Sequence, residues 1–273
     1  MRYIEAILVT SHVDLHGDVF HPEGLAEFAD SLNRMYLPMG VEHDPRIAPI
    51  GRVVSGKLVK LDDGAYAVKG ICEVFEEGDE IKITDPSREV PIDIHDPNSL
   101  EVLYDRTYRD PESQEIIAEI ASLFGSTPEE RCKKSVEPLS ILTIAGAFVA
   151  GAIASGFFNK LGSDAYDALK AGLKRLFGNK KQRAKDSLLV FQFTLPVHGA
   201  MMNAEVILTN PTSEDIEAFF QNGIKLLDQV TPGYSMSQND LRRIVFEFSG
   251  GNLHLRFGVR KDAVPLFPGD KKG

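Results

Sequence analysis

The sequence predicts an α+β protein with two domains. Residues 1–85 contain runs of β-branched and aromatic residues around one short amphipathic helix, so this part is expected to be β-rich. In residues 97–273, strand-like runs alternate with helical stripes, which indicates an antiparallel sheet with helices packed on it. An acidic and irregular stretch between the two parts fits a domain boundary. A chain of 273 residues is long enough to bury two cores.

The composition is that of an ordinary globular protein, with 43% apolar and 26% charged residues. A formal net charge of −10 argues against nucleic-acid binding along the whole chain. Cys72 and Cys132 are expected to be reduced thiols, because the first residues show no signal-peptide pattern. We therefore expect a cytoplasmic protein.

Local patterns predict the N-terminal elements in order. Residues 2–10 have the composition of a strand. A helix is expected to begin at Pro22, since proline suits the first helical turn and an apolar stripe with helical spacing follows it. Residues 51–75 contain two apolar runs joined by Asp-Asp-Gly, which predicts a hairpin because glycine adopts the positive φ that a tight turn requires.

The C-terminal part shows the same kinds of pattern. A strand is expected over 99–109 and a helix over 111–124, where the isoleucines share one face. Thr212 or Ser213 is expected to cap a later helix, whose apolar residues form a single stripe. The remaining predicted strands are 188–197, 201–210, 243–248 and 253–259.

Residues 138–159 form the most apolar run of the chain and contain no charged residue. We expect a helix over 138–158, buried within the C-terminal domain. The run is also just long enough to cross a bilayer, and basic residues follow it between 170 and 185, so membrane contact through 141–158 is the alternative. These basic residues are otherwise expected to form a solvated face.

A group of histidines and aspartates first suggests a metal site. His12, Asp14, His16, Asp18 and His21 are close together in the sequence, and imidazole and carboxylate groups suit zinc, iron or manganese. The segment also looks like the start of a metallophosphoesterase. The chain lacks the later Gly-Asn-His and Gly-His-x-His motifs of that family, so we predict polar turn residues and no bound metal or cofactor.

A second resemblance extends over residues 5–75. The Asp-x-x-Gly-Asp turn at 14–18, the helix after Pro22, His43 and the Pro-Ile-Gly-Arg-Val sequence at 49–53 resemble the N-terminal half of the phage prohead (capsid maturation) serine proteases. That family shares a β-barrel fold with the herpesvirus assemblins, so the resemblance implies a barrel-like N-terminal domain. It also implies that His43 is the general base that accepts the proton of a serine nucleophile.

The nucleophile is less clearly marked than the base. Ser99 has about the family's spacing from His43 and lies at the head of a predicted strand, but no small residue follows it. Ser140 has the better local sequence, Pro-Leu-Ser-Ile-Leu, but lies far downstream in the predicted second domain. Ser87 lies in a predicted loop, and Ser135 is similar to Ser140 in position. The predicted catalytic residues are therefore His43 with Ser99 or Ser140, and no third residue is assigned.

These features lead to one functional expectation and two alternatives. The resemblance implies a serine peptidase that cleaves itself or an assembly partner by acyl transfer. The first alternative is a catalytically inactive interaction or scaffolding protein. The second is a membrane-active effector that uses residues 141–158. The partner is expected to be a protein rather than a nucleic acid.

Overall fold

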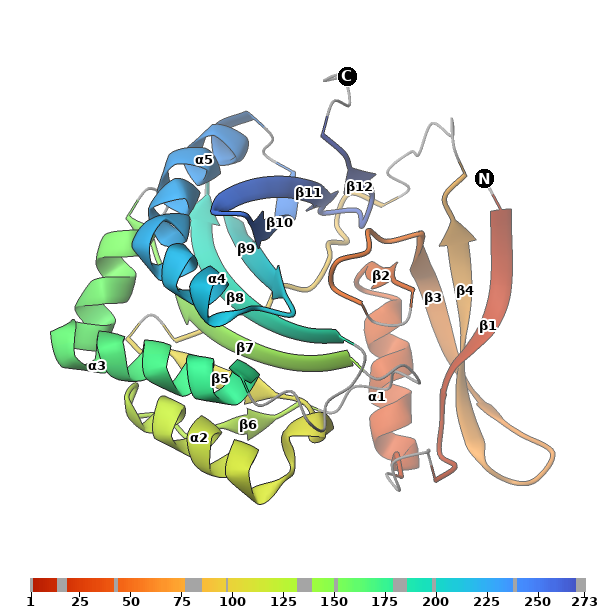
Figure 1. The fold of residues 1–273 in the computed structure, drawn as a ribbon. Coiled ribbons are helices and arrows are strands. Elements are labelled where there is room, and N and C mark those ends of the chain that lie inside the picture. The colour runs from red at the N-terminus through yellow and green to blue at the C-terminus, as the bar shows by residue number, and fades with distance from the viewer. Residues whose placement is uncertain are drawn as a thin grey trace. The chain divides into compact units, whose positions relative to one another are not determined.

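The computed structural model describes residues 2–13, 19–41, 44–76, 85–96, 98–131, 139–149, 152–178, 186–197, 200–237 and 240–268, without the side chains of 163 and 232–237. The fold is α+β, as predicted, and the chain divides into two compact units (Figure 1). Unit 1 contains Met1–Val41, Ile47–Pro91 and Val259–Leu266. Unit 2 contains Glu42–Arg46, Ile92–Gly258 and Phe267–Gly273. The units are thus interleaved along the chain.

Unit 1 is built on an open antiparallel sheet. Its strands are β1 (Arg2–Thr10), β2 (Leu37–Met39), β3 (Gly51–Lys60) and β4 (Tyr66–Val74), in the order β1-β4-β3-β2. β3 and β4 form the predicted hairpin, and Gly64 in its turn has a φ of +89°, which favours glycine. The described strands of this unit do not close into a barrel, so the barrel-like shape implied by the resemblance is not found in them.

One helix, α1 (Pro22–Leu32), covers one face of this sheet. It has proline in its first turn, as predicted, where a missing N–H costs nothing. Its apolar stripe packs on β3 and β4, and the fully buried members of this core are Leu25, Ala29, Leu32, Val53, Val68 and Cys72. Cys72 is a free thiol whose pKa is raised by burial. Cys132 lies outside the described residues.

A buried arginine ties the parts of unit 1 together. Arg52 on β3 is fully buried, and its Nε lies 2.6 Å from Oε2 of the equally buried Glu73 on β4. Its Nη1 donates to the backbone carbonyl of Asp262 at 2.8 Å, and its guanidinium lies over the Tyr36 ring at 4.6 Å. The Asp262 carboxylate is 3.2 Å from the Arg260 guanidinium and 3.9 Å from that of Arg52. The segment 259–266 is thereby attached to the centre of the N-terminal sheet.

An eight-stranded mixed sheet contains the strands of unit 2, and its edge strand at 265–266 belongs to unit 1. Its strand order is β12-β11-β10-β9-β8-β7-β5-β6. The strands are β5 (Glu101–Tyr104), β6 (Glu129–Glu130), β7 (Leu139–Ala147), β8 (Asp186–Val197), β9 (Ala200–Thr209), β10 (Leu241–Ser249), β11 (Asn252–Arg260) and β12 (Pro265–Leu266).

The expectation of an antiparallel sheet is wrong. Three pairs are parallel, namely β5 with β6, β7 with β8 and β9 with β10, whereas β8/β9 and β5/β7 are antiparallel. Each parallel pair is joined through helices: α2 (Pro111–Ser122), α3 (Ile153–Gly178), and α4 (Ser213–Ala218) with α5 (Ile224–Ser237). Parallel neighbours need such a crossover, and antiparallel neighbours do not.

The apolar run at 138–159 is also different from its prediction. Residues 139–147 form strand β7, and the helix α3 begins only at Ile153. The expected helix over 138–158 is therefore wrong for its first half, because a strand buried on both faces has a continuous apolar sequence that does not alternate. No helix in the described parts of the chain combines the length and hydrophobicity needed to span a bilayer.

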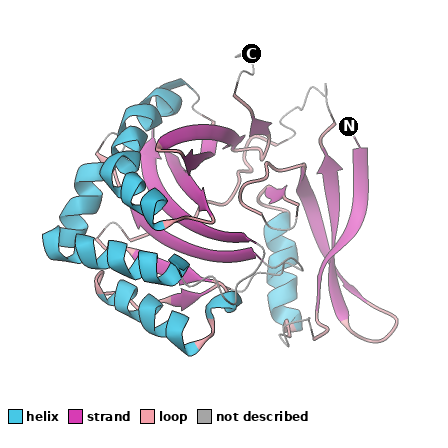
Figure 2. Ribbon diagram, viewed as in Figure 1, coloured by secondary structure: helices cyan, strands magenta, loops and turns pink. Residues whose placement is uncertain are grey.

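The central strands of unit 2 have two very different faces. The helices lie together on one face (Figure 2). Side chains on that face are large and apolar: the rings of Phe191 and Phe193 on β8 lie 6.3 and 6.4 Å from that of Phe157 on α3. Alternate residues of the same strand, such as Gln192 and Thr194, point to the opposite face. We call this second face the polar face.

The Arg52–Glu73 pair gives a test of unit 1. We expect Glu73→Gln to lower the free energy of unfolding by about 3–5 kcal/mol, because it leaves Arg52 buried without its main counter-charge. The measurement is urea denaturation of the full chain.

Glu5→Gln is the matched control in the same sheet. Glu5 is exposed and lies 3.7 and 3.6 Å from the ammonium groups of Lys57 and Lys69. Its replacement should cost less than about 1 kcal/mol, as is usual for surface pairs. Equal losses for the two variants would contradict the importance assigned to Arg52.

Candidate functional site

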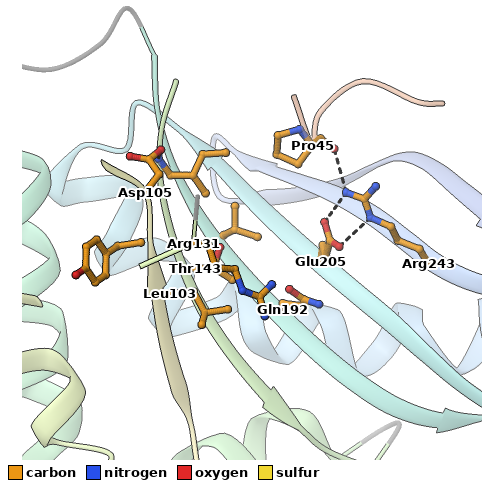
Figure 3. A pocket seen from close by; sticks show the side chains of 11 residues that line it. Pro45, Leu103, Asp105, Arg131, Thr143, Gln192, Glu205 and Arg243 are labelled. Carbon is orange, nitrogen blue, oxygen red and sulfur yellow. Dashed lines mark hydrogen bonds and ion pairs between the residues drawn. The ribbon is translucent and has the colours of Figure 1, made fainter. Parts of the chain in front are cut away.

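A cavity of about 280 Å³ lies on the polar face of unit 2 (Figure 3). Five strands supply most of its wall, because every second side chain of β5, β7, β8, β9 and β10 points to this face. Strand pairing aligns them in rows, with Leu103, Thr143 and Val190 in one and Gln192 and Glu205 in the next. The lining residues are Pro45, Leu103, Tyr104, Asp105, Arg131, Ile141, Thr143, Val190, Gln192, Glu205 and Arg243.

Arg243 and Glu205 form a two-point ion pair at one side of the cavity (Figure 3). The Arg243 Nε and Nη2 atoms lie 2.8 and 2.7 Å from the two oxygens of Glu205. Nη2 also donates to the Pro45 carbonyl at 3.4 Å. Burial disfavours the charged guanidinium, but the adjacent Glu205 outweighs this effect and raises the pKa of Arg243. The two-point contact with Glu205 holds both side chains in fixed positions.

The short segment 44–46 is held against the same sheet. Arg46 donates from Nε and Nη2 to the Asp44 carboxylate at 3.0 and 2.7 Å, and from Nη1 to Oδ2 of Asp186 at 3.0 Å. Hydrogen bonds to Asp44, followed by those to Asp186, raise the pKa of Arg46 against the opposing effect of burial. This double anchor holds the intervening Pro45 at the cavity wall.

Asp105 lines the cavity, and its carboxylate binds backbone N–H groups of the protein itself. Its Oδ2 accepts the backbone N–H of Ile141 on β7 at 2.6 Å, and its Oδ1 accepts from the backbone N–H of Thr107 at 2.9 Å. The Thr107 hydroxyl donates to the same Oδ1. The carboxylate thus fixes the turn after β5 to the neighbouring strand.

A second arginine of the cavity wall, Arg131, pairs with Asp93, which is not itself a lining residue. The Arg131 Nη1 lies 3.2 Å from Oδ2 of Asp93, and the Gln192 amide donates to the same oxygen at 3.4 Å. The Thr194 hydroxyl donates to the backbone carbonyl of Asp93 at 3.0 Å and thereby holds this residue on the sheet. Arg131 is the more accessible of the two arginines, with 44% of its side chain exposed.

The predicted catalytic residues are not assembled among the described residues. His43 lies outside them, and so does Ser135. Ser99 lies in the loop before β5, and its backbone carbonyl accepts from Lys160 Nζ at 3.4 Å. Burial lowers the pKa of Lys160. Neither Ser99 nor Ser140 lines the cavity, and the assignment of a nucleophile stays a prediction.

Ser140 has an environment that does not favour nucleophilic attack. It is fully buried on β7, and its hydroxyl has no hydrogen-bond partner among the described residues. Strand alternation directs it to the helix-covered face, because the adjacent Ile141 lines the cavity on the other face. A nucleophile has to reach a substrate, and Ser140 has no access to solvent here.

His95 is a buried histidine that is not among the predicted site residues. Its Nδ1 lies 2.9 Å from Oε2 of Glu101, only 3% of the residue is exposed, and its Nε2 has no partner among the described residues. No recognisable motif surrounds His95 in the sequence, so the His95–Glu101 pair could be identified only from the three-dimensional structure.

The suspected metal site is only partly described. His12 forms an exposed 2.7 Å contact with Asp63, and His21 lies 3.8 Å from its neighbour Glu23. Asp14, His16 and Asp18 lie outside the described residues. Within the described ranges, no group of three or more histidine, cysteine or acidic side chains could hold a metal ion.

The described basic residues after the apolar run are paired within the protein. Lys170 and Lys174 on α3 donate to Glu217 on α4 at 3.2 and 2.6 Å, and Arg175 donates to Glu119 at 2.8 Å. Hydrogen bonds from Lys174 and then Lys170 lower the pKa of Glu217 to about 2. These contacts join helices to one another. The members between 179 and 185 lie outside the described residues.

Comparison of the chain with protein-family models, with curated proteins and with solved structures found no match. The function of the cavity therefore has to be inferred from the chemistry of its own residues.

The Glu217 cluster predicts a pH effect. The folded pKa of Glu217, about 2, lies below its ordinary value of 4.5, so the pairing adds stability above about pH 4.5 and this stability is lost as the pH falls towards 2. The stability difference between the native protein and Glu217→Gln should therefore disappear across this range in thermal unfolding experiments. Lys174→Gln should show a weaker pH dependence than the native protein, and high salt should reduce the effect. A difference that persists unchanged at pH 2 would contradict this account.

Proposed function

We propose that this chain is a binding protein and that unit 2 takes a small ligand in the cavity on its polar face. The observation that carries the proposal is the fixed set of polar side chains in the cavity wall. Gln192 and Glu205 are only 6% and 8% exposed, and both project from the interior of central strands. A concave site with a few fixed polar groups among apolar ones is typical of ligand pockets.

The rigidity of the wall supports this proposal. The side chain of Arg243 is held at two points by Glu205, and segment 44–46 is anchored through Asp186. Groups that are already oriented lose little conformational entropy when a ligand binds. The neighbouring Leu103, Ile141 and Val190 are almost completely buried and supply apolar surface.

A fragment screen followed by NMR tests the binding function. We expect fragments to shift backbone resonances of β7, β8 and β9, and Thr143→Leu to abolish these shifts because the larger side chain occupies the cavity. Thr127→Leu, at an exposed site outside the cavity, is the control and should bind like the native protein. The proposal fails when no fragment shifts these resonances, or when Thr143→Leu binds as well as the native chain.

A serine peptidase is the second candidate, because the order and spacing of the motifs in residues 5–75 resemble those of the prohead serine proteases. In this function a serine hydroxyl, with Ser99 the first choice, attacks a peptide carbonyl while His43 accepts its proton. The substrate would be the chain itself or an assembly partner.

A fluorophosphonate probe tests the peptidase. Labelling is expected in the native protein and should be lost in both His43→Ala and Ser99→Ala. Ser140→Ala is the control and should retain labelling, because the Ser140 hydroxyl is fully buried. Absence of label on every serine would exclude the serine peptidase mechanism.

A further inference from the structure

The charges around the cavity are unequally neutralised. Two arginines line it, and Arg243 is bound at two points by Glu205 and at a third by the Pro45 carbonyl. The side chain of Arg131 makes one hydrogen bond to the described residues, from Nη1 to Asp93. A guanidinium has five N–H donors, so Arg131 keeps most of its hydrogen-bonding capacity for another acceptor.

The acids of the wall are already engaged. Both oxygens of Glu205 accept from Arg243. The two oxygens of Asp105 accept from the backbone N–H groups of Ile141 and Thr107. A cationic ligand would therefore find no carboxylate in the lining that lacks donors, whereas an anionic ligand would find Arg131.

The other lining residues indicate what kind of organic body carries the anionic group of the ligand. Leu103, Ile141 and Val190 are 3%, 7% and 4% exposed and form an apolar surface beside Arg131. The cavity volume of about 280 Å³ is at the small end for a ligand pocket. These features favour a short apolar body over a long chain or a second charged group.

We propose that the ligand is a small organic acid with a branched or short apolar body; this inference rests on the proposed binding function. The second edge of the Arg131 guanidinium binds the carboxylate, while Asp93 holds the first edge. The Thr143 hydroxyl and the Gln192 amide lie in the same wall and supply neutral hydrogen-bonding groups. The apolar body lies against Leu103, Ile141 and Val190.

Titrations with three probes test this assignment. The probes are 4-methylpentanoate, its neutral analogue 4-methylpentanamide and inorganic phosphate, each followed by NMR shifts of the cavity strands. We expect the carboxylate to bind at least about tenfold more tightly than the amide, because its hydrogen bonds with the guanidinium are charge-assisted. Phosphate alone should bind more weakly than the carboxylate, since it has no apolar body.

Variants of Arg131 link the preference to this residue. Arg131→Gln should weaken carboxylate binding at least about tenfold and leave amide binding unchanged. Arg131→Lys should give an intermediate affinity, because it keeps the charge and loses the two-point geometry. Arg175→Gln removes a partly exposed arginine that pairs with Glu119 on the helix layer, and it should bind like the native protein.

The outcomes separate this inference from the function on which it rests. Equal binding of amide and carboxylate, retention of carboxylate binding by Arg131→Gln, or phosphate binding as tight as that of the carboxylate would each overturn the inference. In these cases the cavity still binds ligands. A native protein whose cavity resonances respond to no probe and to no fragment would overturn the binding function as well.

Discussion

Arg52 is a charged side chain that water does not reach, and unit 1 depends on the groups that neutralise it. A buried guanidinium is tolerated only where its hydrogen bonds and its charge are both satisfied. Glu73 supplies the charge from the adjacent strand, and the Asp262 carbonyl supplies a hydrogen bond from the C-terminal segment. This requirement explains why unit 1, whose sheet is formed by the first quarter of the sequence, also contains residues 259–266.

Local sequence patterns were sufficient to predict the elements that have one apolar and one polar face. The strand at 2–10, the helix beginning at Pro22 and the hairpin at Gly64 were all predicted, because amphipathic spacing and turn chemistry act within a few residues. Strand β7 was predicted as helix, since a strand that is apolar on both faces has no alternation to reveal it. The parallel pairing of β7 with β8 was missed for the same reason, because the crossover β7-α3-β8 cannot be recognised without its first strand.

The cavity could not be predicted from local sequence patterns, for a different reason. Its wall combines single residues from five strands, and only the pairing register brings Thr143, Val190 and Glu205 to one site. One local signal was present: Gln192 and Thr194 interrupt the apolar sequence of β8 at every second position, which marks a polar face. Ser99 was predicted from its spacing along the chain and Ser140 from its local sequence, and neither criterion determines which face of a strand a hydroxyl occupies.

Because the two units are interleaved along the chain, unit 1 cannot be completed until late in synthesis. Ribosomes synthesise the chain from its N-terminus, so β1 to β4 are complete long before residues 259–266 exist. During that interval Arg52 has Glu73 on the adjacent strand, but the hydrogen bond from its Nη1 to the Asp262 carbonyl cannot form. Unit 1, which begins the chain, can therefore be completed only after residues 92–258 of unit 2 have been translated.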